Sequence, residues 1–115
     1  MIHNALSIAG SDPSGGAGIQ ADLKSFSAQG VYGMAVITAL TAQNTTGVSQ
    51  IHKPSPDFVA EQIRMVAADV RIDAIKIGMI ADAVIAKAVS EEVGALSDVP
   101  VILDPVMIAK GGAPL

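Results

Sequence analysis

The sequence contains no cysteine among its 115 residues. Disulfide frameworks, thiolate metal sites and thiol nucleophiles are therefore excluded, which suits a reducing compartment. Aromatic residues make up only 3% of the chain, namely Phe26, Tyr32 and Phe58. They leave little for base-stacking platforms or aromatic cages. His3 and His52 have no partner at metal-ligand spacing, so we interpret both as surface or structural residues.

Long apolar runs and clustered positive charges are also absent. Half of the residues are hydrophobic, but glycine, proline and polar residues divide them into runs well short of the roughly 18 residues of a membrane span. The first residues lack the basic and apolar regions of a secretion signal. The seven lysines and arginines are scattered, and the formal net charge is −4. We therefore expect a cytoplasmic protein that binds neither membranes nor nucleic acid.

Apolar spacing predicts strands that alternate with helices. Short apolar segments predict four strands, at residues 4–9, 33–40, 74–78 and 100–104. Helical spacing predicts one helix from Ile19 to about Gly30, a second that begins at Pro56 after the N-cap Ser55, and a third capped by Asp82. The polar segment 41–49 is predicted to be a loop. This order indicates a doubly wound α/β fold, with a mostly parallel sheet and helices on both faces.

The last residues do not continue this alternation. Residues 110–115 are loop-like, and no helix follows the last predicted strand to cover it. We therefore expect an incomplete α/β domain, whose uncovered sheet edge favours dimerisation or aggregation.

Ligands of open α/β sheets bind beyond the carboxyl ends of the strands. In this sequence the segments at those positions are glycine-rich or polar: residues 10–18, 41–45, 78–80 and 104–107. The glycines of the first segment let backbone N–H groups approach a ligand closely. These segments are therefore the candidate site.

The glycine-rich segment fits two nucleotide-binding patterns poorly. Residues 16–21 match the dinucleotide fingerprint, but residues 38–43 lack the acidic residue expected about 20 positions later. A phosphate-binding P-loop would need a lysine and a hydroxyl residue where Gly16 and Ala17 stand. A nicotinamide site and a tight turn without a ligand stay open as alternatives.

Several single residues at these strand ends, and Asp22 in the first helix, are open to a functional or a structural interpretation. Asp104 ends an apolar strand and is a candidate metal or phosphate-site residue, or a solvated strand end. Gln43 can hydrogen-bond an aminopyrimidine edge, or its own backbone. Met79 can contact a flat ring, or belong to the core. Asp22 can stabilise the first helix through its dipole.

Taken together, the strand-end strings AGSDPSGGAGIQADLKSF (9–26), ITALTAQNT (37–45), IKIGMI (75–80) and ILDPVMIAKGG (102–112) resemble the bacterial hydroxymethylpyrimidine/phosphomethylpyrimidine kinases of thiamine biosynthesis. These kinases belong to the ribokinase superfamily. Pyridoxal kinases share the fold and the DPV-type strand end, but the first two strings resemble the pyrimidine kinases more closely.

The resemblance implies a ribokinase-like fold and transfer of the ATP γ-phosphoryl group to the hydroxymethyl oxygen of the pyrimidine, then to the monophosphate. Gln43 is implied to bind the pyrimidine edge. The other implied pocket residues are Gly10, Ala17, Asp22, Met79 and Val106. Asp104 is implied to lie near Mg²⁺, through water, and Lys110 in a flap over the site. By analogy with the family, a homodimer is possible.

The resemblance also sets a limit on what the chain is expected to do. The family's glycine-rich anion hole and aspartate base have no match in residues 1–115. We therefore expect residues 1–115 to be the N-terminal part of a single kinase domain, inactive or nearly so alone. A pyridoxal kinase-like enzyme, a nicotinamide-binding fragment and a non-catalytic pyrimidine-binding module are the alternatives.

Overall fold

The computed structural model describes residues 1–104. Strands and helices follow one another in the order β1 (Asn4–Gly10), α1 (Gly18–Ala28), β2 (Tyr32–Asn44), β3 (Gly47–His52), α2 (Pro56–Asp69), β4 (Ala74–Ile77), α3 (Ala83–Gly94) and β5 (Val101–Leu103). The predicted positions of all three helices and of the four strands are thereby confirmed to within a few residues.

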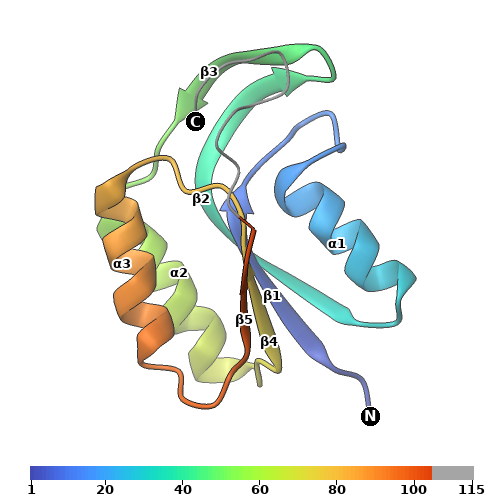
Figure 1. Ribbon diagram of the computed structural model, residues 1–115, viewed down its shortest axis with the longest axis vertical. Coiled ribbons are helices and arrows are strands. Elements are labelled where there is room, and N and C mark those ends of the chain that lie inside the picture. The colour runs from blue at the N-terminus through green and yellow to red at the C-terminus, as the bar shows by residue number, and fades with distance from the viewer. Residues whose placement is uncertain (105–115) are drawn as a thin grey trace.

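The strands form one sheet in the order β3-β2-β1-β4-β5. β1 pairs in parallel with β2 and β4, and β4 pairs in parallel with β5. Helix α1 covers one face of the sheet, and α2 and α3 lie together on the other (Figure 1). The predicted α/β architecture with helices on both faces is confirmed.

The hydrophobic core lies between the sheet and the pair α2 and α3. Its fully buried residues come from the sheet and from both of these helices: Leu6, Ile8, Val36, Val59, Ile63, Ile75, Ile85 and Val89. The three strands that supply Leu6, Val36 and Ile75 are the central ones, so the middle of the sheet is its most deeply buried part. In the part of the chain that the structure describes, no helix combines the length and the apolar character needed to cross a membrane.

Local capping explains where the second and third helices begin. The Oγ atom of Ser55 accepts a hydrogen bond from the backbone N–H of Phe58 at 3.1 Å, and Pro56 occupies the first turn. The Oδ1 atom of Asp82 accepts from the N–H of Ile85 at 2.9 Å. Both caps satisfy N–H groups that a helix leaves unpaired. Both were predicted from sequence.

The prediction of a loop at residues 41–49 is wrong. Strand β2 continues to Asn44, and β3 returns antiparallel to it from Gly47 to His52. The Oδ1 atom of Asn44 closes the turn, because it accepts from the N–H and hydroxyl of Thr46 and from the N–H of Gly47. Backbone pairing carries this two-stranded ribbon past the end of β1 (Figure 1). The side chains of that part of the ribbon are largely exposed. Polar residues are therefore tolerated in it.

Candidate functional site

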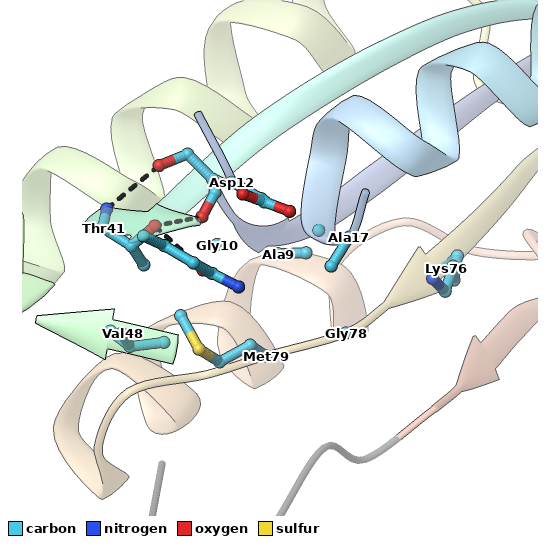
Figure 2. A pocket seen from close by; sticks show the side chains of 12 residues that line it. Ala9, Gly10, Asp12, Ala17, Thr41, Val48, Lys76, Gly78 and Met79 are labelled. Atoms are coloured by element: carbon cyan, nitrogen blue, oxygen red, sulfur yellow. Dashed lines mark hydrogen bonds between the residues drawn. The ribbon is translucent and has the colours of Figure 1, made fainter. Parts of the chain in front are cut away.

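The segments that follow β1 and β4, together with the β2–β3 ribbon, enclose one cavity at the carboxyl edge of the sheet. Its volume is about 90 Å³. The lining residues come from five elements or their ends: Ala9, Gly10, Ser11, Asp12, Ala17, Gly18, Thr41, Gln43, Val48, Lys76, Gly78 and Met79 (Figure 2). Four residues that the sequence had singled out, Gly10, Ala17, Gln43 and Met79, thus meet in one place.

Asp12 organises the glycine-rich loop between β1 and α1. It is 2% exposed. Its Oδ1 atom accepts hydrogen bonds from the N–H and the hydroxyl of Ser14 at 2.9 and 2.7 Å, and its Oδ2 atom accepts from the N–H of Gly16 at 3.0 Å. Its own N–H donates to Oε1 of Gln20 on α1 at 2.7 Å. The carboxylate therefore closes the loop, and the backbone N–H of Asp12 joins the loop to the first turn of the helix.

These donors also stabilise the charged form of Asp12. The Ser14 hydroxyl, followed by the N–H groups of Ser14 and Gly16, lowers the pKa of the Asp12 carboxyl below its ordinary value of 3.8, although burial opposes this. A carboxyl with a depressed pKa in the folded state stabilises the fold above its unfolded-state pKa. That contribution is lost as the pH falls through the lower folded-state pKa.

Asp12→Asn is expected to lower the free energy of unfolding by about 1–3 kcal/mol near neutral pH, because an amide cannot accept at both of its ends. The difference between the two proteins should shrink as the pH falls through the lowered folded-state pKa of Asp12, because the native carboxyl then also becomes protonated. Urea denaturation of both proteins across this pH range measures the difference. A difference that does not change with pH would show that the charge of Asp12 is not what stabilises the loop.

Two glycines allow the backbone segments around the cavity to approach closely. Gly18 has a positive φ of 57°, and a Cβ atom there would collide with the carbonyl oxygen of Gly10. A Cβ atom at Gly10 would collide with Cε of Met79, which lies across the cavity. Met79 is itself held by its carbonyl oxygen, which accepts a hydrogen bond from the hydroxyl of buried Thr38 at 2.6 Å. Glycine is therefore required where α1 begins, and Gly10 leaves the space that the end of the Met79 side chain occupies.

The β2 side of the cavity is held by the pair Ser11 and Thr41. The N–H of Thr41 donates to Oγ of Ser11 at 3.1 Å, and Oγ1 of Thr41 lies 2.7 Å from the Ser11 carbonyl oxygen. The same Oγ1 lies 3.1 Å from Oε1 of Gln43. A hydroxyl carries one proton, so it donates to only one of these oxygens at a time. The shorter contact to Ser11 leaves the amide of half-buried Gln43 available to a ligand.

Asp22 lies behind the cavity and not in its lining. Its side chain is 12% exposed. Its Oδ2 atom accepts from the hydroxyl of buried Ser7 at 2.7 Å, and its Oδ1 atom accepts from Nζ of Lys76 at 2.5 Å. Lys76 also lies 3.8 Å from Oδ2 of Asp104 at the end of β5. The interpretation of Asp22 as a residue that only stabilises its helix is incomplete, because its partners are on β1 and β4.

The other predicted site residues are placed as follows. Asp104 lies within the residues that the structure describes. Its side chain is 64% exposed, and its Oδ2 atom lies 3.8 Å from Nζ of Lys76. Val106 and Lys110 lie outside the described residues. Asp12 and Thr41 lie in the predicted segments 10–18 and 41–45 but had not been singled out, whereas Val48 and Lys76 lie outside the predicted segments and were missed; all four line the cavity.

Two comparisons with known sequences indicate the same family of kinases. The family model described as phosphomethylpyrimidine kinase matches residues 12–115. The hydroxymethylpyrimidine/phosphomethylpyrimidine kinase of Escherichia coli (strain K12) is 60% identical over 97% of this chain, and that of Bacillus subtilis (strain 168) is 51% identical over 99%. In both cases the chain spans about 42% of the relative's length.

Solved structures agree with this sequence comparison. A crystal structure of phosphomethylpyrimidine kinase from Clostridium difficile 630 superposes with a TM-score of 0.88 and 48% identity, over 98% of this chain and 49% of that one. A pyridoxal kinase from Staphylococcus aureus in complex with pyridoxal gives a TM-score of 0.85 and 36% identity, over 96% of this chain and 42% of that one.

Proposed function

The chain belongs to the phosphomethylpyrimidine kinase family, and on that premise we propose that it serves the ATP-dependent phosphorylation of hydroxymethylpyrimidine and of its monophosphate in thiamine biosynthesis. The observation that carries the proposal is the cavity at the carboxyl edge of the sheet. The loops that follow the parallel strands β1 and β4 converge on it together with the β2–β3 ribbon. Such a small cavity, mostly apolar with few polar groups, suits one flat heterocycle.

Each polar or soft group of the cavity has a part in this proposal. The amide of Gln43 both donates and accepts hydrogen bonds, as the adjacent amino group and ring nitrogen of an aminopyrimidine require. The thioether of Met79 packs against a face of the ring. Gly10 and Ala17 leave room for the ring beside the backbone. Asp22 acts through Lys76, which lies between it and the cavity.

The proposed nucleotide is ATP, with Mg²⁺ near Asp104. Structures of Staphylococcus aureus pyridoxal kinase contain ADP or AMP-PCP. Residues 1–104 hold no group of three metal-ligating side chains, but Mg²⁺ often keeps several waters and uses one or two carboxylates together with substrate phosphates. The exposed carboxylate of Asp104 fits that pattern through a water molecule. The ion, when bound, would neutralise phosphate charge.

We further propose that these residues correspond to the N-terminal part of a single kinase domain, since the chain spans about 42% of its relatives. In this assignment the present residues position the pyrimidine, and the base that accepts the hydroxyl proton belongs to a part of the domain without a counterpart in residues 1–115. Phosphoryl transfer depends mostly on positioning and charge neutralisation. The roles of Val106 in the pocket and of Lys110 in a flap stay predictions of the family resemblance.

Calorimetric titration tests the proposal against its competitors. We expect hydroxymethylpyrimidine to bind more tightly than pyridoxal, and NADH not to bind. Pyridoxal kinase remains the second candidate, because solved pyridoxal kinases share the fold at 35–37% identity. Tighter binding of pyridoxal would favour that assignment, and binding of NADH alone would overturn the family-based proposal.

A matched pair of glutamine variants shows whether the ligand occupies this cavity. Gln43→Leu should weaken binding of hydroxymethylpyrimidine by about tenfold or more, because a site built to hydrogen-bond a ligand loses most when a partner is removed. Gln50 is exposed on β3 of the same ribbon and lies outside the cavity lining. Gln50→Leu should therefore bind like the native chain. Equal effects of the two substitutions would contradict the assigned role of Gln43.

A further inference from the structure

The ammonium group of Lys76 lies between two carboxylates from distant parts of the chain. Its Nζ atom is 2.5 Å from Oδ1 of Asp22 on α1 and 3.8 Å from Oδ2 of Asp104 after β5. The other carboxylate oxygen of Asp22 accepts from the hydroxyl of Ser7, which is fully buried on β1. Lys76 therefore links the hydrogen-bonded pair Ser7 and Asp22, between β1 and α1, with the end of the sheet where the phosphoryl donor is proposed to bind.

Of the ion pair formed by Lys76 and Asp22, only Lys76 presents a polar group to the cavity. Lys76 is among the lining residues, whereas Asp22 is not, and their side chains are 29% and 12% exposed. In Figure 2, Lys76 lies at the opposite side of the cavity from Val48 of the β2–β3 ribbon. A ligand that fills the cavity between them meets the lysine at one end.

The ammonium group keeps hydrogen-bonding capacity for a ligand. A lysine has three N–H donors and no acceptor. One donor is used by Asp22, and the 3.8 Å separation from Asp104 exceeds hydrogen-bond distance. A neutral ligand oxygen beside Nζ can therefore accept a hydrogen bond while the ion pair with Asp22 stays intact.

Resting on the proposed function, we propose that Lys76 is a substrate-contacting residue whose ammonium donates a hydrogen bond to the hydroxymethyl oxygen of the pyrimidine. The orientation follows from two positions in the structure. Gln43, the proposed partner of the ring edge, comes from β2, whereas Lys76 on β4 lies beside Asp104, the proposed magnesium residue. The oxygen that receives the phosphoryl group must face the metal side, so it faces Lys76.

The test combines a change in the protein with a matched change in the ligand. Binding of hydroxymethylpyrimidine is compared with binding of an analogue in which a methyl group replaces the hydroxymethyl group. The proteins are the native chain, Lys76→Met and the control Lys87→Met, which removes an ammonium from an exposed position on α3, on the other face of the sheet from α1. Isothermal titration gives six dissociation constants.

The native chain and Lys87→Met should bind the hydroxymethyl compound about tenfold more tightly than the methyl analogue, as expected for a hydrogen bond to a charged group. In Lys76→Met this preference should vanish, because the loss falls on the hydroxymethyl compound alone. A structural role would instead weaken both ligands by the same factor. An unchanged preference in Lys76→Met therefore overturns the proposal.

The test also covers a variant that does not fold and a native chain that does not distinguish the two compounds. Lys76→Met leaves the carboxylate of Asp22 without its cation, which can prevent folding. If it does, the comparison is made in Asp22→Asn/Lys76→Met against Asp22→Asn, where that charge is absent. If the native chain binds neither compound, the proposed function fails, and the role of Lys76 fails with it. If the native chain binds both with equal affinity, only the role of Lys76 fails.

Discussion

Gly18→Ala is expected to lower the free energy of unfolding by about 2–5 kcal/mol, the sum of a left-handed backbone conformation and a collision in a packed region. The φ angle of Gly18 is 57°, and an added Cβ atom would meet the carbonyl oxygen of Gly10 and its carbonyl carbon, the latter at 3.2 Å. Both obstacles are backbone atoms, which cannot move aside without displacing the end of β1. Urea denaturation followed by circular dichroism measures the change.

Two other glycines separate the contributions to this effect. Gly30 also has a positive φ, of 74°, but nothing lies within 4 Å of a Cβ atom built there. Gly47 likewise has open space around it, and its φ is not in the left-handed region. The loss of stability should therefore fall in the order Gly18→Ala, Gly30→Ala, Gly47→Ala. A Gly18→Ala chain as stable as Gly30→Ala would show that the contact between α1 and β1 is looser than described.

Gly10→Ala is expected to weaken binding of hydroxymethylpyrimidine by about tenfold or more while changing stability by less than about 1.5 kcal/mol. The new methyl group would meet Cε of Met79, the far end of a flexible side chain, and lie 3.5 Å from the carbonyl oxygen of Ala39. Met79 can move, but the space it moves into is the cavity. Calorimetric titration and urea denaturation of the same preparations give the two quantities.

Gly47→Ala serves as the control for this substitution too, because it adds a methyl group on β3 where nothing lies within 4 Å. It should bind and unfold like the native chain. Native affinity in Gly10→Ala would mean that the ligand does not share space with Met79. A large loss of stability with unchanged affinity would assign Gly10 to the fold alone.

Features decided by neighbouring residues could be predicted from the sequence. The N-caps Ser55 and Asp82 bond to N–H groups three residues further along the chain, so a short window contains both donor and acceptor. The three parallel strand pairs follow from apolar segments separated by helices. For the same reason, three of the four segments expected at the carboxyl edge of the sheet, 10–18, 41–45 and 78–80, meet around one cavity. Of the fourth segment, Asp104 is not among the lining residues, and residues 105–107 lie outside the described part of the chain.

The β2–β3 ribbon shows where pattern reasoning failed. Residues 41–44 are polar or small and alternate without a buried face, so nothing in their hydrophobicity indicates a strand. Their pairing with Gly47–His52 depends on a turn closed by the side chain of Asn44. The Asn-Thr-Thr-Gly sequence of this turn was the one local signal of a hairpin.

Contacts between distant residues could not be predicted. Lys76 meets Asp22 across 54 positions of sequence, and it stands in a short strand whose two buried residues, Ile75 and Ile77, are apolar. Only the register between β1 and β4, which places Ser7 beside Lys76, brings these side chains together. The role of Asp12 could have been predicted, because Asp-x-Ser in a glycine-rich loop is typical of a side chain that closes a turn.

We infer that an aminopyrimidine binds in the cavity at the carboxyl edge of the sheet. Backbone NMR chemical shifts of the labelled chain, recorded while hydroxymethylpyrimidine is added, test it most directly. The account predicts that the largest changes occur at Gly10, Ala17, Gln43 and Met79. A second, larger groove of about 420 Å³ lies between β2 and α2 and is lined by Leu40 and Phe58. Changes confined to that groove, or no changes at all, would contradict the account.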